Sequence, residues 1–409
     1  MIQIKPAIPP IMRSRCPHCG EICQATSILW QGIHVCKAVR CSNCSTLFVE
    51  DLPIGHAIIA GFKVDLTHMI GMQTYGEKGY QSWFGRPFLM SLLSPNEKEN
   101  IEINKEVFWN STDVIIVNCL DYLYGHSLLK LLNVEYYVNR YPQYGVIVIV
   151  PRVLRWMVPE GVAEIWEIDL PFVDFLQFFP SLNSAIGKEC ERFSSIYLSK
   201  AYPHPKYFNI SLFTRIKKHS FSKEEWRITF VWRSDRIWCK EGVYVKALED
   251  FQSKNNAIQT QISNVCELFL RLKRVFPAAI YTVAGLGCEG RLPEWIDDCR
   301  VDKYSFDDEK RVCQIYSDSR LVVGIHGSNM ILPSAHAGLT LDIIPDDRWG
   351  NLGQDIGYQE EDIRMIVHRY IHVPVQVEVK QIAWIAENQI KNYSHHHKLM
   401  NYIPQRPNS

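Results

Sequence analysis

Two Cys-x-x-Cys pairs near the start of the chain have the spacing of metal ligands. Cys16 and Cys19 form the first pair, and Cys41 and Cys44 form the second. Each pair presents two thiolates from one tight turn, and four thiolates complete the tetrahedral shell that structural Zn²⁺ prefers. The pattern predicts a zinc ribbon, because neither pair sits between a strand and a helix as a redox pair would. Spare ligands in a different register would be Cys23, Cys36, His18 and His34.

A second polar group follows an apolar run at residues 320–325, which we expect to be a strand. His326 and Gly327 come directly after it, and Ser328 and Asn329 open a helix expected over residues 328–337. Glycine allows a ligand to approach the backbone, and the free N–H groups of a helix start favour an anion. The segment therefore predicts a phosphate or diphosphate site. The alternative is that Ser328 only caps the helix and His326 is a core histidine.

Two further expected strands end in residues suited to the same ligand. The strand expected at residues 228–232 is followed by Arg233 and Arg236, and arginine binds phosphate in a bidentate manner. Alternatively, Arg233 pairs with Asp235 and only braces the loop. The strand expected at residues 279–284 runs into Gly285 and Gly287, which would let a nucleotide lie close, although such a pair is a weak signal by itself.

The elements that must position these residues alternate between strands and helices in two halves. In the first half we expect strands at 114–117, 145–150 and 163–168 and a helix at 124–138; in the second, further helices at 258–276 and 307–316 and a strand at 339–344. This rhythm predicts an α/β fold with two Rossmann-like domains facing a cleft, plus the small zinc ribbon. A proline-rich segment at 202–205 marks the linker. The expected domains are a zinc ribbon at 1–55, an N-terminal Rossmann-like domain at 56–205, a C-terminal one at 206–375, and a C-terminal helix and tail at 376–409.

Composition limits the classes of function that remain. The 409 residues include 44 Lys plus Arg and 44 Asp plus Glu, so no general charge attracts nucleic acid, which is not expected as a partner. The longest apolar stretches are too short to span a bilayer, and no secretion signal is expected at the N-terminus. The odd number of cysteines, 13, suits a reducing cytoplasm better than a disulfide framework.

The second half resembles a known family. The run from Val323 to Asn329 with a proline shortly after it, the upstream Arg233–Arg236 segment and the strand end at Leu341–Pro345 are similar to the C-terminal half of GT-B glycosyltransferases, nearest to family 61-type enzymes, over residues 226–350. Ser328 and Asn329 stand where that family has small residues, and Asp342 stands where glutamate is more usual. The resemblance implies that the nucleotide-sugar diphosphate is held by Arg233, Arg236, His326, Gly327, Ser328 and Asn329, and the strand-end glycines Gly285 and Gly287 join this donor site.

The resemblance extends to Leu123–Leu129, which is similar to a helix start in the acceptor half of the family. There His126 is the first choice for a catalytic base and Asp121 the second, because the unperturbed pKa of histidine lies near neutrality. The alternative is that His126 only caps or packs against the helix start.

The sequence as a whole is interpreted as a glycosyltransferase that moves a sugar from a nucleotide-sugar donor to a saccharide or lipid-linked glycan acceptor. The expected reaction is inverting and needs no catalytic metal, so that the ribbon zinc is the one cofactor. A lipid-linked acceptor would bring the protein to a membrane surface. The alternatives are a nucleotide-sugar epimerase, and a zinc-ribbon protein that binds nucleic acid or protein on a degenerate α/β body.

Overall fold

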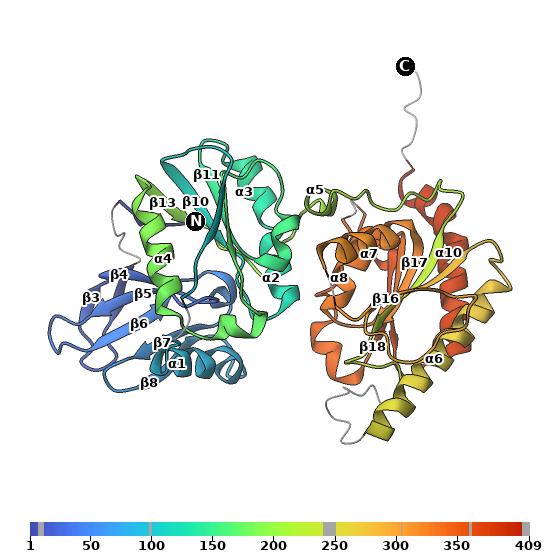
Figure 1. Ribbon diagram of the computed structural model, residues 1–409, viewed down its shortest axis with the longest axis horizontal. Coiled ribbons are helices and arrows are strands. Elements are labelled where there is room, and N and C mark those ends of the chain that lie inside the picture. Colours follow the sequence, from blue (N-terminus) through green and yellow to red (C-terminus); the bar gives the residue numbers. More distant parts are fainter. Residues whose placement is uncertain (7–11, 98–99, 240–250, 304, 360–361, 403–409) are drawn as a thin grey trace, which may run out of the picture. The chain divides into compact units, whose positions relative to one another are not determined.

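The chain folds into two compact units, Met1–Asn209 and Ile210–Ser409 (Figure 1). The computed structural model describes residues 1–6, 12–97, 100–239, 251–303, 305–359 and 362–402.

Unit 1 contains a six-stranded sheet whose four inner strands are parallel. The inner strands are β13 (Ser195–Leu198), β10 (Asp113–Asn118), β11 (Gly145–Pro151) and β12 (Glu164–Ile168), in that spatial order. Two antiparallel strands, β1 (Ile2–Lys5) and β9 (Asn104–Val107), pair with the outer sides of β13 and β12. β11 is buried along its whole length, which explains its continuous apolar sequence.

The described residues of unit 1 form four α-helices, namely α1 (Arg86–Leu93), α2 (Tyr124–Leu131), α3 (Val134–Arg140) and α4 (Pro180–Glu191). The single helix expected over 124–138 is in fact two, because Asn133 interrupts it. The Asn133 side-chain amide donates to the carbonyl groups of Leu129 and Lys130, and also to that of Tyr202. A side chain that binds the helix carbonyls competes with the next turn of the helix. Shorter helical turns are η2 (Gly55–Ile58), η3 (Gln81–Gly85), η4 (Arg152–Met157) and η5 (Phe172–Leu176).

The cysteine pairs belong to an antiparallel region of unit 1. β2 (Arg13–Arg15) pairs with β3 (Ile22–Gln24), and a five-stranded sheet follows in the order β4 (Ser27–Trp30), β5 (Val35–Arg40), β6 (Leu47–Asp51), β7 (Gly61–Asp65) and β8 (Ile70–Tyr75). The sheet therefore runs well past residue 55, where the sequence analysis ends the ribbon. The reason is that β7 continues the pairing of β6 and buries Phe62 and Val64 on the same face of the sheet as Val49.

Unit 2 is built on a six-stranded sheet that is parallel throughout. Its strands are β14 (Arg227–Arg233), β15 (Ile280–Leu286), β16 (Asp297–Val301), β17 (Ser319–Ile325), β18 (Leu339–Ile344) and β19 (Tyr370–Pro374). Their spatial order is β16-β15-β14-β17-β18-β19. Numbered along the chain, this is the order 3-2-1-4-5-6 of dinucleotide-binding folds.

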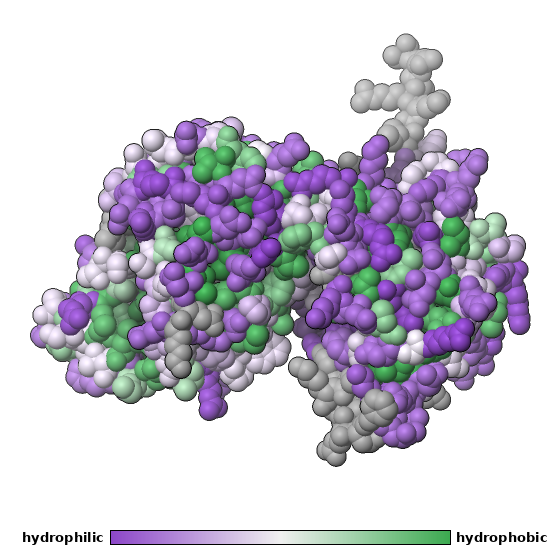
Figure 2. All heavy atoms as spheres, in the orientation of Figure 1, coloured by the Kyte–Doolittle hydropathy of each residue, from purple (hydrophilic) through white to green (hydrophobic). Residues whose placement is uncertain are grey.

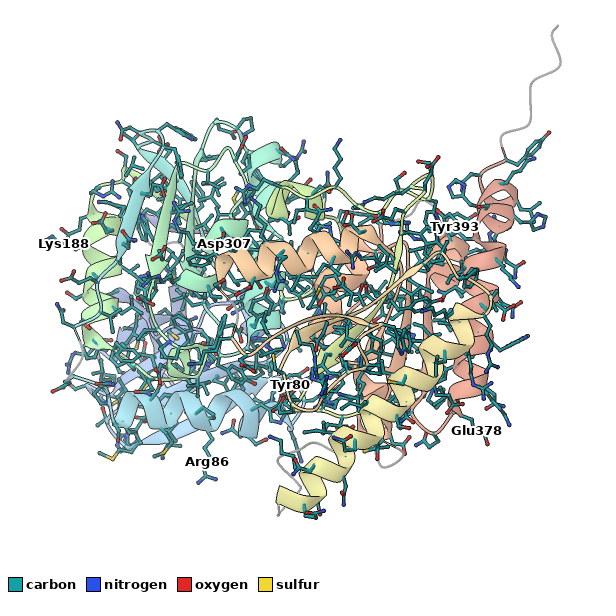
Figure 3. All side chains as sticks on the ribbon, turned by 45° about the vertical axis from the view of Figure 1, so that its right-hand side comes forward. Tyr80, Arg86, Lys188, Asp307, Glu378 and Tyr393 are labelled. Carbon is teal, nitrogen blue, oxygen red and sulfur yellow. The ribbon has the colours of Figure 1, made fainter. Side chains whose placement is uncertain are left out.

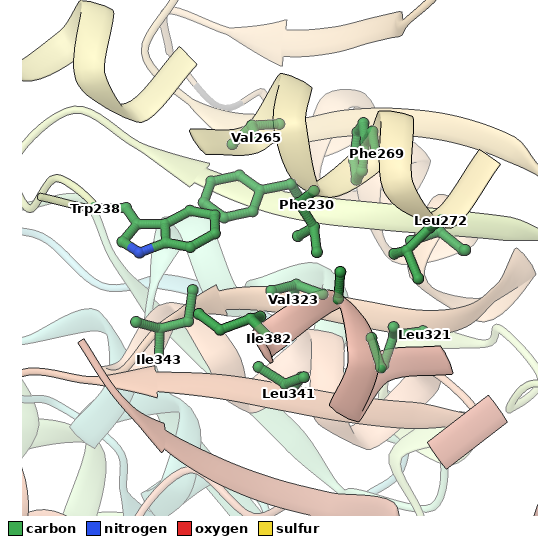
Figure 4. Packing of buried hydrophobic residues seen from close by; sticks show 14 of the residues in the cluster. Phe230, Trp238, Val265, Phe269, Leu272, Leu321, Val323, Leu341, Ile343 and Ile382 are labelled. Atoms are coloured by element: carbon green, nitrogen blue, oxygen red, sulfur yellow. The ribbon is translucent and has the colours of Figure 1, made fainter. Parts of the chain in front are cut away.

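The helices of unit 2 are α5 (Ile210–Thr214), α6 (Phe251–Lys273), α7 (Phe306–Asp318), α8 (Ile331–His336), α9 (Ile363–Arg369) and α10 (Val379–Met400), with the short turns η7 (Ser328–Met330) and η8 (Asp346–Asn351). α6 lies alongside α10, on which Tyr393 is labelled (Figures 1 and 3). Phe230, Leu341 and Ile343 of the sheet pack with Phe269 of α6 and Ile382 of α10 in one buried cluster (Figure 4).

The α/β class predicted from the sequence is confirmed, since both units carry a mainly parallel sheet and the cysteine pairs lie between antiparallel strands, after β2 and after β5. The visible surface mixes hydrophilic residues with smaller hydrophobic areas (Figure 2). Among the described residues, none of the helices combines the length and the apolar character needed to cross a membrane.

Candidate functional site

The strand order of unit 2 defines where a ligand has room to bind. β14 and β17 are neighbours, and the chain leaves β14 toward β15 on one side and β17 toward β18 on the other. At such a switch point, the connections diverge and leave a crevice beyond the carboxyl ends of the two strands. Arg233 ends β14, and His326 follows β17. Two of the predicted donor-binding segments thus meet at the switch point.

Direct contacts join these two segments. The guanidinium group of Arg233 donates from Nη1 to Asn329 Oδ1 at 2.7 Å, and Arg236 Nη1 donates to the carbonyl oxygen of His326. Arg233 also forms a bidentate pair with Asp235, with Nε to Oδ1 at 2.6 Å and Nη2 to Oδ2 at 2.5 Å. The bracing role considered as an alternative for Arg233 is therefore present, and it coexists with the contact to the other segment.

Gly327 lies where the two arginine side chains approach the second segment. Its φ angle is +149°, and a Cβ atom placed there would lie 2.8 Å from Arg233 Nη1 and 3.4 Å from Arg236 Nη1. Asn329 Oδ1 would lie 3.1 Å from the same Cβ. A side chain at residue 327 would therefore occupy the space onto which both guanidinium groups face.

Three arginine side chains repel one another at this switch point. Burial is the main cause that lowers the pKa of Arg236 to about 10; the charges of Arg233 and Arg348 act in the same direction, and those of Asp347 and Asp235 oppose them. Burial and the charge of Arg233 likewise lower the pKa of Arg348, which follows β18 in the turn η8. Placing like charges together costs free energy unless an anion binds among them. The arrangement is therefore suited to a polyvalent anion.

Other predicted donor residues are placed differently from the expectation. The helix expected over residues 328–337 is in fact a three-residue turn, η7, followed by the six-residue helix α8. A helix this short does not form an anion site by itself. Pro333 has no N–H for the carbonyl of Asn329, which explains the break. Ser328 is exposed, and Gly327, not Ser328, precedes the turn.

The two strand-end glycines have a packing role. A Cβ atom on Gly285 would lie 2.1 Å from the carbonyl oxygen of Trp232, and one on Gly287 would lie 2.5 Å from Ser234 Oγ. Both have φ angles in the left-handed region, +139° and +105°. Close contact with the end of β14 therefore accounts for both glycines without a ligand.

The side chain of His326 is buried and faces two carboxylates. It is 1% exposed, and its Nδ1 lies 2.5 Å from Asp342 Oδ2 and 3.6 Å from Asp355 Oδ2. Burial lowers the pKa of His326, but the two carboxylates outweigh burial and raise it overall. Burial raises the pKa of Asp355 to about 6. The His326 side chain is thus a buried, hydrogen-bonded histidine. Its backbone carbonyl accepts a hydrogen bond from Arg236 Nη1.

Unit 1 places the predicted base at its own switch point. The inner sheet order β13-β10-β11-β12 changes direction between β10 and β13, and Asp121 and His126 follow β10. His126 Nδ1 lies 3.3 Å from Asp121 Oδ1, so that Nε2 is the ring nitrogen left for a substrate. Both residues therefore lie near the carboxyl end of β10, and their catalytic role stays a prediction.

Asp121 is fully engaged by its neighbours. Its Oδ2 lies 2.7 Å from His56 Nε2 and 2.8 Å from Lys130 Nζ, and the carboxylate is completely buried. Burial by itself would raise the pKa of Asp121, but the charges of Lys130 and His56 hold it well below its usual value. An ionised, surrounded carboxylate is a poor base, so Asp121 is suited to orienting His126.

His56 and Lys130 were not found by sequence reasoning. His56 comes from the turn η2 of the antiparallel region and stacks on Phe84, with ring centroids 4.4 Å apart. Burial is the main cause that lowers its pKa to about 4. Lys130 is 1% exposed in an otherwise apolar helix. A lysine within such an apolar run indicates a buried ion pair, and this pattern is visible in the sequence.

The four predicted cysteine ligands form one cluster. Cys16 Sγ lies 3.6 Å from Cys44 Sγ, and Cys19 Sγ lies 3.5 Å from Cys41 Sγ. All four sulfur atoms lie within 4.8 Å of one another. Zn–S bonds of about 2.3 Å give tetrahedral edges of about 3.8 Å, so the set fits Zn²⁺. Of the spare ligands, Cys36 contacts Asp51 and His18 stacks on His68.

No family model matches the sequence, and no curated protein matches it. Solved structures with a similar fold include glycosyltransferases. In particular, the chain is similar to ADP-heptose LPS heptosyltransferase II of E. coli, with a TM-score of 0.37 and 8% identity over 69% of this chain and 99% of that one.

Two more similar structures are heptosyltransferase WaaC of E. coli, solved with ADP, and SnogD of Streptomyces nogalater. WaaC gives a TM-score of 0.39 and 11% identity over 68% of this chain and 99% of its own. SnogD gives 0.24 and 10% over 68% of this chain and 80% of its own. At these identities the likeness concerns the fold alone.

Proposed function

We propose that the protein is a glycosyltransferase, with unit 2 binding the diphosphate of a nucleotide-sugar donor. The observation that carries the proposal is the group of three mutually repelling arginines, Arg233, Arg236 and Arg348, at the switch point. A diphosphate would relieve this repulsion. Gly327 leaves room for it beside Arg233 and Arg236.

Unit 1 would supply the base for a saccharide or lipid-linked glycan acceptor. With its Nδ1 held by Asp121, His126 would accept the proton of the acceptor hydroxyl at Nε2. The hydroxyl oxygen would bond to the anomeric carbon while the bond from that carbon to the diphosphate oxygen breaks, which inverts the anomeric configuration. The arginines would stabilise the negative charge that builds up on the departing diphosphate, so the proposal includes no metal ion in the transfer step.

The four-cysteine cluster is proposed to hold a structural Zn²⁺. The support is geometric, since the four sulfur atoms all lie within 4.8 Å of one another. We propose no role for this cluster in the transfer reaction.

Nucleotide binding tests the proposal directly. The full chain is mixed with UDP, GDP, CMP and ADP, and the melting temperature and calorimetric Kd are measured, because a bound nucleotide stabilises the fold by mass action. One nucleotide is expected to bind, and Arg233→Gln is expected to weaken that binding at least tenfold. The matched control is Arg271→Gln, because Arg271 is an exposed arginine on α6 paired with Glu267.

A second variant separates binding from chemistry. His126→Asn is expected to keep the nucleotide Kd of the wild type while lowering the rate of sugar transfer by about 10²- to 10⁴-fold. Failure of all four nucleotides to bind, or equal affinity for wild type and Arg233→Gln, contradicts the proposal.

A further inference from the structure

A buried cluster in unit 2 contains more ligand atoms than its hydrogen bonds use. Asp342 of β18 faces Gly324 of β17 and His372 of β19 in the parallel register. His326 comes two residues after Gly324, and alternate residues of a strand share one face. His326, Asp342 and His372 therefore lie together on the face of the sheet opposite the cluster formed by Leu341 and Ile343.

A fourth ligand comes from the segment after η8. Asp355 is 1% exposed, and its Oδ2 lies 3.6 Å from His326 Nδ1. Ser334 Oγ donates to the backbone carbonyl of Asp355 at 2.6 Å and so fixes the segment. The four side chains then offer two imidazole nitrogens and two carboxylates.

Two of these buried atoms, Oδ1 of Asp342 and Nε2 of His372, have no hydrogen-bond partner among the described residues. The carboxylate of Asp355 accepts a hydrogen bond from the backbone N–H of Gly327. Leaving a buried polar atom without a partner costs about 1–3 kcal/mol in mutational data. His326, Asp342 and His372 each offer one ligand atom within 4.8 Å of the others, and a cation bound by these three and by Asp355 would explain why such polar atoms are buried together.

We propose that His326, Asp342, Asp355 and His372 bind a second Zn²⁺ ion, separate from the four-cysteine site. Zn–N and Zn–O bonds of about 2.1 Å give tetrahedral edges of about 3.4 Å. The 3.6 Å between His326 Nδ1 and Asp355 Oδ2, and the 3.5 Å between His372 Nε2 and Asp342 Oδ2, fit such edges. His326 Nδ1 and Asp342 Oδ2, 2.5 Å apart, separate by about 0.9 Å when the ion enters.

Neighbouring groups support these ligands. Tyr370 Oη donates to Asp342 Oδ2 at 3.0 Å, and the backbone of Leu352 is hydrogen-bonded to the ring of His372. Outer hydrogen bonds of this kind orient metal ligands. The ion would hold the side chain of His326 in place and would thereby fix the loop that contains Gly327. The backbone carbonyl of His326 also accepts a hydrogen bond from Arg236.

A similar cluster in unit 1 shows why composition alone does not define such a site. His56, Asp121 and His126 also lie within metal-ligand distance of one another. There, Lys130 Nζ lies 2.8 Å from Asp121 Oδ2, and His126 binds the other oxygen. An ammonium group already neutralises that carboxylate, so the cluster of unit 1 is expected to bind no metal.

Metal analysis of the full-length protein tests the second site. Elemental analysis is expected to find two zinc ions per chain in the wild type and one in Asp355→Asn. His56→Gln, which removes a histidine from the similar cluster of unit 1, is the matched control and is expected to keep two.

Cobalt substitution assigns each ion to its ligands and does not depend on the variant folding. A four-thiolate site gives intense sulfur-to-metal charge-transfer bands, whereas a site of nitrogen and oxygen ligands gives only weaker visible bands. Titration of the metal-free wild type is expected to show both kinds of spectrum, one equivalent each. A single equivalent with thiolate character, or two zinc ions in a folded Asp355→Asn, overturns the proposal.

Discussion

Replacing Lys130 by methionine should destabilise unit 1 strongly, because the lysine balances a completely buried carboxylate. Lys130 is 1% exposed and Asp121 is 0% exposed, and Nζ also donates to the carbonyl oxygen of Leu120 at 2.8 Å. Removing one partner of a buried ion pair costs about 3–5 kcal/mol, since the other charge stays buried without compensation. Methionine fills much of the same volume, so the expected loss reflects the charge and not a cavity.

The loss should also depend on pH in a defined direction. The charge of Lys130 lowers the pKa of His56, while that of Asp121 raises it. Without Lys130, His56 can bind a proton more readily and neutralise Asp121 itself. We therefore expect a loss near 4 kcal/mol at pH 8, and a loss smaller by about 1 kcal/mol or more at pH 5.5.

Hydrogen exchange of peptides from β10 and β11 measures this loss for unit 1 alone, because amide protection in core strands reports the opening of the unit that contains them. The double variant Lys130→Met/Asp121→Asn is the control, and it should recover most of the stability lost by the single variant. A loss below 1 kcal/mol in Lys130→Met, or a double variant less stable than the single one, would refute the inferred ion pair.

Two further predictions concern stability. Lowering the pH from 7 to 5 should destabilise the protein, because His56 and His336 have pKa values of about 4 when folded against about 6.5 when unfolded. Each histidine lowers the free energy of unfolding by about 2 kcal/mol over this range, since the unfolded chain takes up protons that the folded chain does not. Urea midpoints that stay constant from pH 7 to pH 5 would contradict this prediction. Gly285→Ala should cost at least about 2 kcal/mol in thermal unfolding, since its Cβ would overlap the carbonyl of Trp232, whereas Gly187→Ala, in the open on α4, should be neutral or stabilising.

The parts of the fold that the sequence predicted are those set by local pattern. The strands that became β14 and β17 are continuous apolar runs, and the parallel order carries the residues after them to one sheet edge. The extension of the antiparallel sheet through β8 was not predicted, because its strands are short and turn-rich. The break at Asn133 depends partly on a contact with Tyr202, which no local pattern contains.

The same division applies to the candidate sites. The arginines after β14 and the glycine after β17 were predicted, since each follows a recognisable strand. His56 was missed because its contact with Asp121 spans 65 residues of sequence. Asp355 was missed because it lies in a loop, and His372 was missed because it carries no motif and only the sheet register brings it near His326.

The two antiparallel edge strands of unit 1 make the cysteine-bearing region an insertion and not an appendage. β1 precedes that region and lies at one border of the sheet, whereas β9 follows it and lies at the opposite border. Excising the region would leave two ends separated by the full width of the sheet, with no short splice to join them. Exchange of this region between proteins as a cassette is therefore topologically disfavoured.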